Sequence, residues 1–344
     1  MPCRVTIQPS GHVFELEDDE SLLAGALRQG YGLPYGCRSG SCGTCKGRVL
    51  SGEVDLGDYQ PQALSSEDIA AGKALFCVAH PRGDVVIEAR MISGVRDIQV
   101  RRLPVRVESI ERVNHDVAVL RLKLPANEKF NFLPGQYIDF LMPDGKRRSF
   151  SLASVPADGA PLELHIRNYA GGTFSRHVFE ELKPRTILRI EGPLGTFFLR
   201  EDSDKPIIFM AGATGFAPIK GIIEGALAQG TLRQMVLYWG VRTRADLYMA
   251  DLASSWQAAH RNFTFIPVLS EPAADDHWQG RTGLVHEAIL ADFADLSGYE
   301  VYACGAPVMV DAGKRGFTGT RGLPEAAFYS DPFTVSVDAA KPVG

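Results

Sequence analysis

The sequence lacks long apolar runs and a strong charge of either sign. No uninterrupted apolar stretch approaches the ~18 residues of a membrane-spanning helix, and residues 1–10 lack the apolar core of a secretory signal. The 36 Lys and Arg nearly balance 41 Asp and Glu, for a net charge of −5. We therefore expect a cytoplasmic protein without membrane insertion, and no nucleic-acid binding through a basic face.

Internal repeats and low-complexity segments are also absent. The 344 residues are 45% hydrophobic and 22% charged, which is ordinary for globular proteins and excludes a disordered chain, a coiled coil or a collagen-like repeat. The length favours two or three domains. The first 100 residues hold 9 Lys and Arg against 13 Asp and Glu, so most of the net charge lies there.

Three segments differ in their hydrophobic pattern. Residues 1–95 predict a small α+β domain, and residues 96–102 predict a linker. Short apolar runs in 103–202 predict an antiparallel β-barrel. Strands alternate with helices in 203–344, which predicts an α/β domain with a parallel sheet. The expected helices span 22–29, capped by Ser21, and 173–182, 218–229 and 254–261. The expected strands span 4–7, 12–15, 48–50, 85–87, 105–108, 117–122, 136–141, 162–167, 187–191, 206–210, 235–240, 263–268 and 299–304.

Cysteine is scarce, but its positions are clustered. Of six cysteines, Cys37, Cys42 and Cys45 fall within nine residues, and Cys77 follows later. The spacing Cys-x4-Cys-x2-Cys-x31-Cys is that of plant-type [2Fe–2S] sites, and three glycines in the loop allow close wrapping around a cluster. A zinc site is the alternative, although zinc loops usually carry paired Cys-x2-Cys knuckles. Cys3 is assigned no role.

Two motifs in the second segment suit a flavin nucleotide. Arg148-Ser149-Phe150-Ser151 ends a strand and offers a cation for phosphate and a ring for stacking. Gly171-Gly172-Thr173-Phe174-Ser175 precedes the helix at 173–182, and N–H groups at a helix N-terminus suit a pyrophosphate. Each motif is weak alone, because arginines at strand ends and Gly-Gly turns are common.

A third motif suits a dinucleotide. Residues 207–218 indicate a strand, a turn with Gly212, Thr214 and Gly215, and a helix with Pro218 in its first turn. Arg242 follows the next strand, where an adenosine ribose would lie. Arg242 and Arg244 could pair with a 2′-phosphate, but we favour NADH.

In this order the motifs resemble the ferredoxin–NADP reductase superfamily, and residues 1–90 resemble a plant-type ferredoxin domain with the β-grasp fold. The resemblance spans essentially the whole chain. It implies a three-module reductase with a [2Fe–2S] cluster, FAD rather than FMN, and NADH, with NADPH as the alternative. Phe150 stands where the family has Tyr, so the phenolic hydrogen bond to the flavin is lost.

The resemblance also implies roles for individual residues. Ser151 would face the reactive edge of the flavin, Cys304 would lie near the nicotinamide, and Phe333 would cover one of the rings; these three are the candidate catalytic residues. The candidate metal ligands are Cys37, Cys42, Cys45 and Cys77. The candidate cofactor-binding residues are Arg148, Ser149, Phe150, Ser151, His165, Ile166, Arg167, Gly171, Gly172, Thr173, Ser175, Gly212, Thr214, Gly215, Pro218, Arg242, Cys304, Gly305 and Met309.

The cofactors imply electron transfer. A nicotinamide gives two electrons as hydride and a [2Fe–2S] cluster takes one, so a flavin must stand between them. We expect the partner to be a terminal oxygenase or hydroxylase, and we favour a monomer. One alternative is a reductase of the CDP-6-deoxy-Δ3,4-glucoseen reductase type, which serves a dehydrase. A second alternative is a zinc-stabilised flavin-binding module without a cluster.

Overall fold

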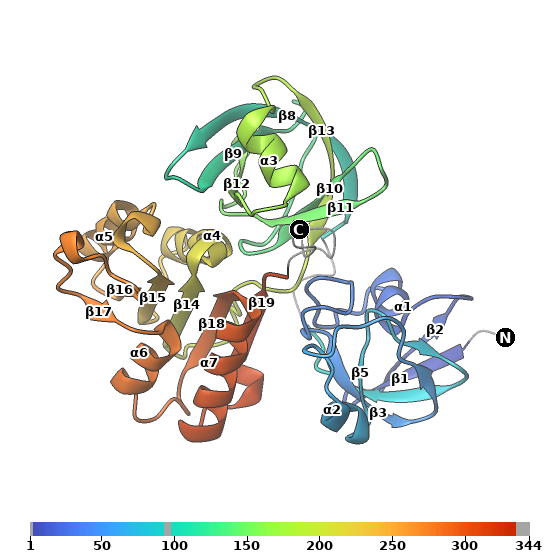
Figure 1. Cartoon of the computed structure of the whole chain (residues 1–344). Helices are drawn as coiled ribbons and strands as arrows, with labels where there is room; N and C mark the ends of the chain where they lie inside the picture. The colour runs from blue at the N-terminus through green and yellow to red at the C-terminus, as the bar shows by residue number, and fades with distance from the viewer. Residues whose placement is uncertain (1–2, 93–97, 335–344) are drawn as a thin grey trace. The chain divides into compact units, whose positions relative to one another are not determined.

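The computed structural model describes residues 3–92 and 98–334 (Figure 1). Contacts divide the chain into two compact units, one of residues 1–99 with 194–196 and one of 100–193 with 197–344. Positions 96 and 97 of the expected linker lie outside the described residues, and its last two positions already belong to the first strand of the second unit. None of the described helices has the length and apolar character needed to cross a bilayer.

The first unit is the predicted α+β domain. Its five-stranded sheet has the order β2-β1-β7-β3-β5, in which β1 and β7 run parallel. Ser21 caps α1 as predicted, because its side chain accepts a hydrogen bond from the Ala24 amide. The buried face of this helix consists of Leu22, Leu23 and Ala26. The elements are β1 (Cys3–Gln8), β2 (His12–Leu16), α1 (Leu22–Arg28), β3 (Lys46–Ser51), β4 (Val54–Asp55), α2 (Ser66–Ala70), β5 (Lys73–Leu75), β6 (His80–Pro81) and β7 (Val85–Glu88).

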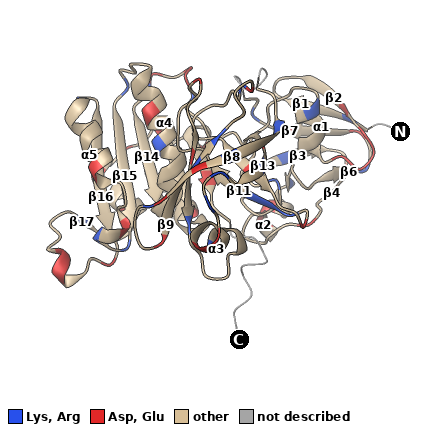
Figure 2. Cartoon of the chain, turned by 90° about the horizontal axis from the view of Figure 1, so that it is seen from above, with Lys and Arg blue, Asp and Glu red and all other residues tan. Residues whose placement is uncertain are grey.

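The second unit begins with an antiparallel barrel. Its sheet has the order β11-β10-β13-β8-β9-β12, and an antiparallel bridge from Leu152 to Leu164 joins the two end strands. Charged residues of both signs lie on β8, β11 and β13 (Figure 2), where Glu191 pairs with Arg102 and Arg147. The elements are β8 (Arg101–Arg112), β9 (Val117–Lys123), β10 (Tyr137–Leu141), β11 (Arg147–Ser151), β12 (Leu162–Arg167), α3 (Thr173–Glu180) and β13 (Ile187–Leu194).

The second unit continues with a six-stranded parallel sheet of order β17-β16-β15-β14-β18-β19. Successive residues of β14 face opposite sides: Phe209 packs with α4 and α5, and Met210 with α6 and α7. The elements are β14 (Ile207–Gly212), η1 (Ala213–Gly215), α4 (Phe216–Ala228), β15 (Met235–Val241), η2 (Arg244–Asp246), α5 (Ala250–Ala259), β16 (Phe263–Leu269), η3 (Ala274–Asp276), β17 (Arg281–Thr282), α6 (Val285–Asp292), β18 (Glu300–Gly305), α7 (Pro307–Thr320), η4 (Glu325–Ala327) and β19 (Phe328–Pro332).

The predicted fold class is confirmed, with shifts at some helix ends. The helix expected at 254–261 spans Ala250–Ala259, and the helix expected from 218 begins at Phe216. Sequence patterns missed α2, α6 and α7. Helix α7 carries three glycines, which disfavour an isolated helix, but Gly313 lets it pack closely on Met210 of the sheet.

Phe174 of α3 fills the barrel, and its removal tests that packing. Its side chain is buried, and its ring centroid lies 4.6 Å from that of Phe140. Phe174→Ala should lower the free energy of unfolding of the second unit by about 3–5 kcal/mol, measured by urea titration with circular dichroism. Leu232→Ala, at a side chain that is 91% exposed, should change it by less than about 0.5 kcal/mol. Equal effects would contradict the assigned packing.

Candidate functional site

The four predicted metal ligands form two pairs of thiols. A hydrogen bond between the Cys37 and Cys42 side chains lowers the pKa of Cys37 to about 5 and raises that of Cys42. The same contact between Cys45 and Cys77 raises the pKa of Cys45 and lowers that of Cys77. The structure therefore brings the four residues together in two pairs, and a [2Fe–2S] cluster requires four cysteine thiolates.

The loop around these cysteines directs backbone N–H groups at sulfur. The amides of Ser39 and Ser41 donate to Cys37 Sγ at 3.5 and 3.4 Å, and the Cys37 amide donates to Cys42 Sγ at 3.4 Å. Gly40 has φ +68°, and a Cβ there would lie 2.4 Å from the carbonyl oxygen of Asp58. Such N–H groups stabilise negative charge on cluster sulfurs, so the donor set fits the predicted cofactor.

The spacing of the sulfur atoms argues against mononuclear zinc. Four thiolates at ~2.3 Å from one tetrahedral zinc ion would lie about 3.8 Å from one another. In the part of the chain that the structure describes, no three cysteine sulfurs lie within 4.8 Å of one another. Two separate pairs match a binuclear cluster better than a single ion.

The flavin motif lies on β11, and its two adjacent arginines differ. Arg147 is held by Glu191 at 2.5 Å and by Asp139 at 3.4 Å. Arg148 donates from its guanidinium to the carbonyl of Arg147 at 2.8 Å. Ser149 donates to Asp139 at 2.6 Å, and Ser151 is buried at the end of the strand.

The second half of the flavin motif forms the N-terminus of α3. Gly171 has φ +80°, and Gly172 is the N-cap residue without a side-chain cap. Ser175 turns its hydroxyl back to the Gly172 carbonyl at 3.3 Å. The first N–H groups of a helix have no partner within it, so those of Thr173 and Phe174 are a donor set that fits a phosphate.

The strand expected beside the flavin directs its side chains to both faces. Ile166 lies in the barrel core, whereas Arg167 on the other face binds Asp116 at 2.7 Å. The imidazole of His165 is fully buried between Glu163 and Tyr248. Phe150 packs one side against Phe174, with 5.2 Å between centroids, and remains half-buried.

The dinucleotide motif lies where the parallel sheet changes direction of winding. From β14 the chain proceeds to β15, β16 and β17 on one side, and β18 and β19 lie on the other. Ligands of open α/β sheets bind at the carboxyl ends of the strands at such a point. Gly212 ends β14 and Gly305 ends β18, and a Cβ on Gly305 would lie 3.0 Å from the Gly212 Cα. The backbones therefore form a cradle that fits a nucleotide.

The turn between β14 and α4 is rigidly supported. A Cβ on Gly215 would lie 2.1 Å from the carbonyl oxygen of Cys304. Ala213, where the family usually has glycine, has φ +48°, and its carbonyl accepts a hydrogen bond from Trp239 Nε1 at 3.0 Å. Trp239 also stacks on Phe216 at 3.9 Å with 8° between the rings. Thr214 and Pro218 are buried in the turn and in the first turn of α4.

The remaining nicotinamide candidates divide into buried and exposed residues. Cys304 is fully buried, its thiol donates to the Asp331 carbonyl at 3.1 Å, and burial raises its pKa. The Phe333 amide donates to the Gly305 carbonyl at 2.8 Å, so Phe333, directly after β19, lies beside the end of β18. Met309 in the first turn of α7 lies against Gly212.

The two arginines proposed to meet the ribose end differ in their surroundings. Arg242 directly follows β15 and is exposed. Arg244 lies on η2, where its amide and guanidinium both contact Asp276 at 3.4 Å.

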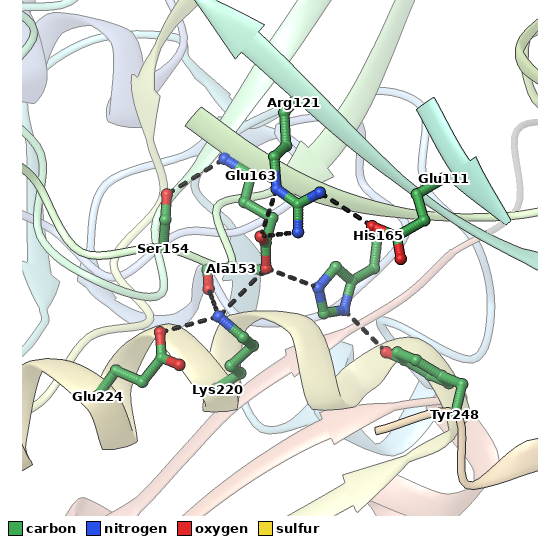
Figure 3. Close-up of polar contacts among 9 residues, drawn as sticks. All are labelled: Glu111, Arg121, Ala153, Ser154, Glu163, His165, Lys220, Glu224 and Tyr248. Carbon is green, nitrogen blue, oxygen red and sulfur yellow. Dashed lines mark hydrogen bonds and ion pairs between the residues drawn. The ribbon is translucent and has the colours of Figure 1, made fainter. Parts of the chain in front are cut away.

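Sequence reasoning missed a buried charged cluster in the second unit, drawn in Figure 3. Glu163 lies at its centre and contacts His165, Arg121 and Lys220 at 3.2, 3.1 and 3.1 Å. Burial opposes ionisation of Glu163, but His165 and Lys220 outweigh it and lower the pKa of Glu163 to about 2. The signal in the sequence was one lysine inside the apolar run Phe216–Ile223.

Comparison with known domain families follows the same three segments. Residues 5–82 match the 2Fe-2S iron-sulfur cluster binding domain. Residues 104–199 match the oxidoreductase FAD-binding domain, and residues 209–315 match the oxidoreductase NAD-binding domain. The cofactors are therefore a [2Fe–2S] cluster, FAD and NAD(H), as predicted.

Relatives share this organisation from end to end. The chain is 40% identical over 336 residues to the CDP-6-deoxy-L-threo-D-glycero-4-hexulose-3-dehydrase reductase of Yersinia pseudotuberculosis, covering 98% of this chain and 100% of the relative. It is 36% identical over 348 residues to the phenol 2-monooxygenase reductase component DmpP of Pseudomonas sp. strain CF600, covering 99% and 97%.

A solved structure shows the same architecture. The cytochrome P450 reductase GcoB of Amycolatopsis is 34% identical and superposes with a TM-score of 0.77, covering 97% of this chain and 99% of that one. Full-length identity and the three domain matches agree with the paired thiols and the two nucleotide motifs. The chain thus belongs to the three-module iron–sulfur flavoprotein reductases of the ferredoxin–NADP reductase superfamily, and it is an NAD(P)H-dependent oxidoreductase.

Proposed function

We propose that this reductase takes electrons from NADH and delivers them to a 3-dehydrase that acts on a CDP-6-deoxyhexulose. The observation that carries the proposal is 40% identity along the full length of a reductase named for that dehydrase. The sequence alone favoured an oxygenase or hydroxylase partner, with the deoxysugar system as its alternative. The comparison supports the alternative as the first candidate.

An oxygenase or hydroxylase component is the second candidate acceptor. The specific observation in its favour is 36% identity over nearly the full length of the phenol 2-monooxygenase reductase component. Because the two classes of partner share one reductase architecture, the cofactor sites do not separate them. The partner surface on the [2Fe–2S] domain must do so.

The proposed residue roles follow the geometry. Bound FAD supplies the conversion of a hydride into single electrons. We assign its phosphates to Arg148 and the α3 N-terminus, and its ring to the ends of β11 and β12, near Ser151. The four cysteines hold the cluster in the domain at 1–95. We assign FAD binding to the barrel at 103–202 and NADH binding to the domain at 203–344.

The nucleotide site is assigned to the carboxyl ends of β14 and β18. Gly212, Gly215 and Gly305 leave space for the cofactor backbone, and Cys304 and Phe333 stand on the nicotinamide side. We propose NADH as the donor, because the Asp276 carboxylate accepts a hydrogen bond from the backbone amide of Arg244, close after the strand where the ribose is expected. A carboxylate at that place opposes a 2′-phosphate.

The acceptor is identified by reconstitution. The purified protein with NADH should restore turnover of a CDP-4-keto-6-deoxyhexose 3-dehydrase and should not restore phenol hydroxylation by an oxygenase component. Product formation is measured by chromatography in both assays, with NADPH compared to NADH. Restoration of the hydroxylase alone would support the second candidate and contradict the first. If the protein still reduces ferricyanide but restores neither the dehydrase nor the hydroxylase, both candidate functions are contradicted.

Cys42→Ser tests the division of labour between flavin and cluster. The variant should lose the rhombic electron paramagnetic resonance signal of the reduced cluster and the transfer to the protein partner. It should retain NADH-driven ferricyanide reduction, because the flavin site lies in the other unit. Cys3→Ser is the matched control, since Cys3 lies on β1 outside the thiol pairs, and should retain the signal. Loss of ferricyanide reduction in Cys42→Ser would contradict the scheme.

Arg148→Ala tests the placement of the flavin phosphates. Loss of a charge-assisted phosphate contact should weaken FAD retention about tenfold or more, measured as FAD per protein after gel filtration. Arg147→Ala is the matched neighbour. It should lower stability by leaving Glu191 and Asp139 with fewer partners, while FAD content stays near that of the unaltered protein. Full FAD occupancy in Arg148→Ala would count against the assignment.

A further inference from the structure

Helix α4 links the two nucleotide motifs of the second unit. Its N-terminus continues from the turn at Gly215, and its body lies on residues 152–155, which directly follow the flavin motif. A Cβ on Gly221 would lie 3.0 Å from the carbonyl oxygen of Leu152 and 3.3 Å from that of Ser154. Helix and segment are thus in direct backbone contact, and a shift of one moves the other.

Lys220 fastens this contact from the adjacent position of the helix. Its side chain is only 8% exposed. Its ammonium donates to the carbonyl of Ala153 at 3.0 Å, contacts Glu163 of β12 at 3.1 Å, and donates to Glu224 at 2.8 Å. One cation therefore joins α4, the segment after β11 and the strand expected beside the flavin (Figure 3).

A second polar bridge starts from the same face of β12. His165, two residues after Glu163, contacts the Tyr248 hydroxyl at 2.9 Å through Nδ1 and Glu163 at 3.2 Å through Nε2. Tyr248 follows η2, beyond the end of β15, and its ring meets Phe216 edge-on at 5.9 Å. The first bridge therefore ends at Lys220 in the second turn of α4, and the second ends beside Phe216 in the first turn.

Stability alone does not account for a buried lysine here. Burying an ammonium and a carboxylate costs free energy that their attraction only partly returns, and apolar replacements are often as stable. What the charges do provide is direction, because the three contacts hold the ammonium against its own helix, against the segment after β11 and against β12. The consequence is a fixed position of the nucleotide turn relative to the flavin motif.

We propose that Lys220 is a positioning residue for hydride transfer, which locks α4 and the nucleotide turn onto the segment that follows the flavin motif. The inference rests on the proposed roles of these two motifs. Hydride transfer requires donor and acceptor atoms about 3–3.5 Å apart, and a displacement of about 1 Å can cost about 100-fold in rate.

Lys220→Met is the primary test. It should lower the limiting rate of flavin reduction by NADH, measured by stopped flow, about tenfold or more. The NADH concentration for half-maximal rate and the FAD content should stay within about twofold, because Lys220 does not lie in either motif. The long-wavelength absorption of the flavin–nicotinamide complex should weaken. Without FAD or NADH, amide hydrogen exchange in residues 216–228 should become faster.

In Lys220→Met, the two carboxylates that lose the ammonium either keep other partners or can be protonated. Glu163 keeps Arg121 and His165. Glu224 is 27% exposed at its side chain, and burial already raises its pKa, so it can take up a proton. Lys220→Arg, which keeps the charge, should recover part of the limiting rate and of the long-wavelength absorption.

A second buried cation separates positioning from stability. Arg233 is also only 8% exposed, and it binds Glu300 at 2.6 Å and the carbonyls of Arg200 and Lys205. Arg233→Met should lower the midpoint of thermal unfolding and leave the limiting rate within about twofold of the unaltered protein. If the limiting rate falls equally in Lys220→Met and Arg233→Met, Lys220 contributes only to stability and the proposal is wrong.

A glycine pair tests the same geometry without changing charge. Gly221→Ala forces α4 away from the Leu152 carbonyl by a few tenths of an ångström and should also lower the limiting rate. Gly319→Ala on α7 is the control, because a Cβ at that position would have no neighbouring atom within 4 Å. An unchanged limiting rate and unchanged absorption in both Lys220→Met and Gly221→Ala would overturn the proposal. If NADH fails to reduce the flavin even in the unaltered protein, the proposed function itself is wrong.

Discussion

The contact between helix α4 and the backbone of residues 152–155 constrains both nucleotide motifs of the second unit. The helix begins at the turn expected to hold the nicotinamide nucleotide, and the segment follows the strand expected to hold the flavin. Glycine at 221 removes the side chain that would separate them, and the buried ammonium of Lys220 directs the contact. The parallel sheet and the barrel each have their own hydrophobic core. The polar contact of α4 with residues 152–155 therefore fixes the position of the sheet relative to the barrel, which neither core determines.

The first unit meets a different constraint, which is to hold four thiols at defined places. Three belong to one loop, and the fourth follows β5, so the sheet must bring the two chain segments together. The positive φ of Gly40 and its approach to the Asp58 carbonyl allow the loop to turn its amides toward sulfur. The result is two pairs of thiols, Cys37 with Cys42 and Cys45 with Cys77.

Sequence patterns predicted what depends on local spacing. The three clustered cysteines, the glycine turn before α4 and the Ser21 cap all follow from residues close together in the chain, and Cys77 was added by the family spacing. The role of Arg147 and the partners of Lys220 did not, because Glu191 lies 44 residues from Arg147, and Glu163 lies 57 residues from Lys220. Helix α7 was missed because its glycines lower helix propensity, while its packing on Met210 depends on the folded sheet. Individual cofactor contacts remain predictions.

The stacked pair of Trp239 and Phe216 has a practical consequence. All three tryptophans of the chain, at 239, 256 and 278, lie in the nucleotide segment. Tryptophan emission therefore arises from that segment alone. Because Trp239 contacts both the turn carbonyl of Ala213 and the first residue of α4, a nucleotide bound at the expected turn should change the tryptophan emission without an attached dye.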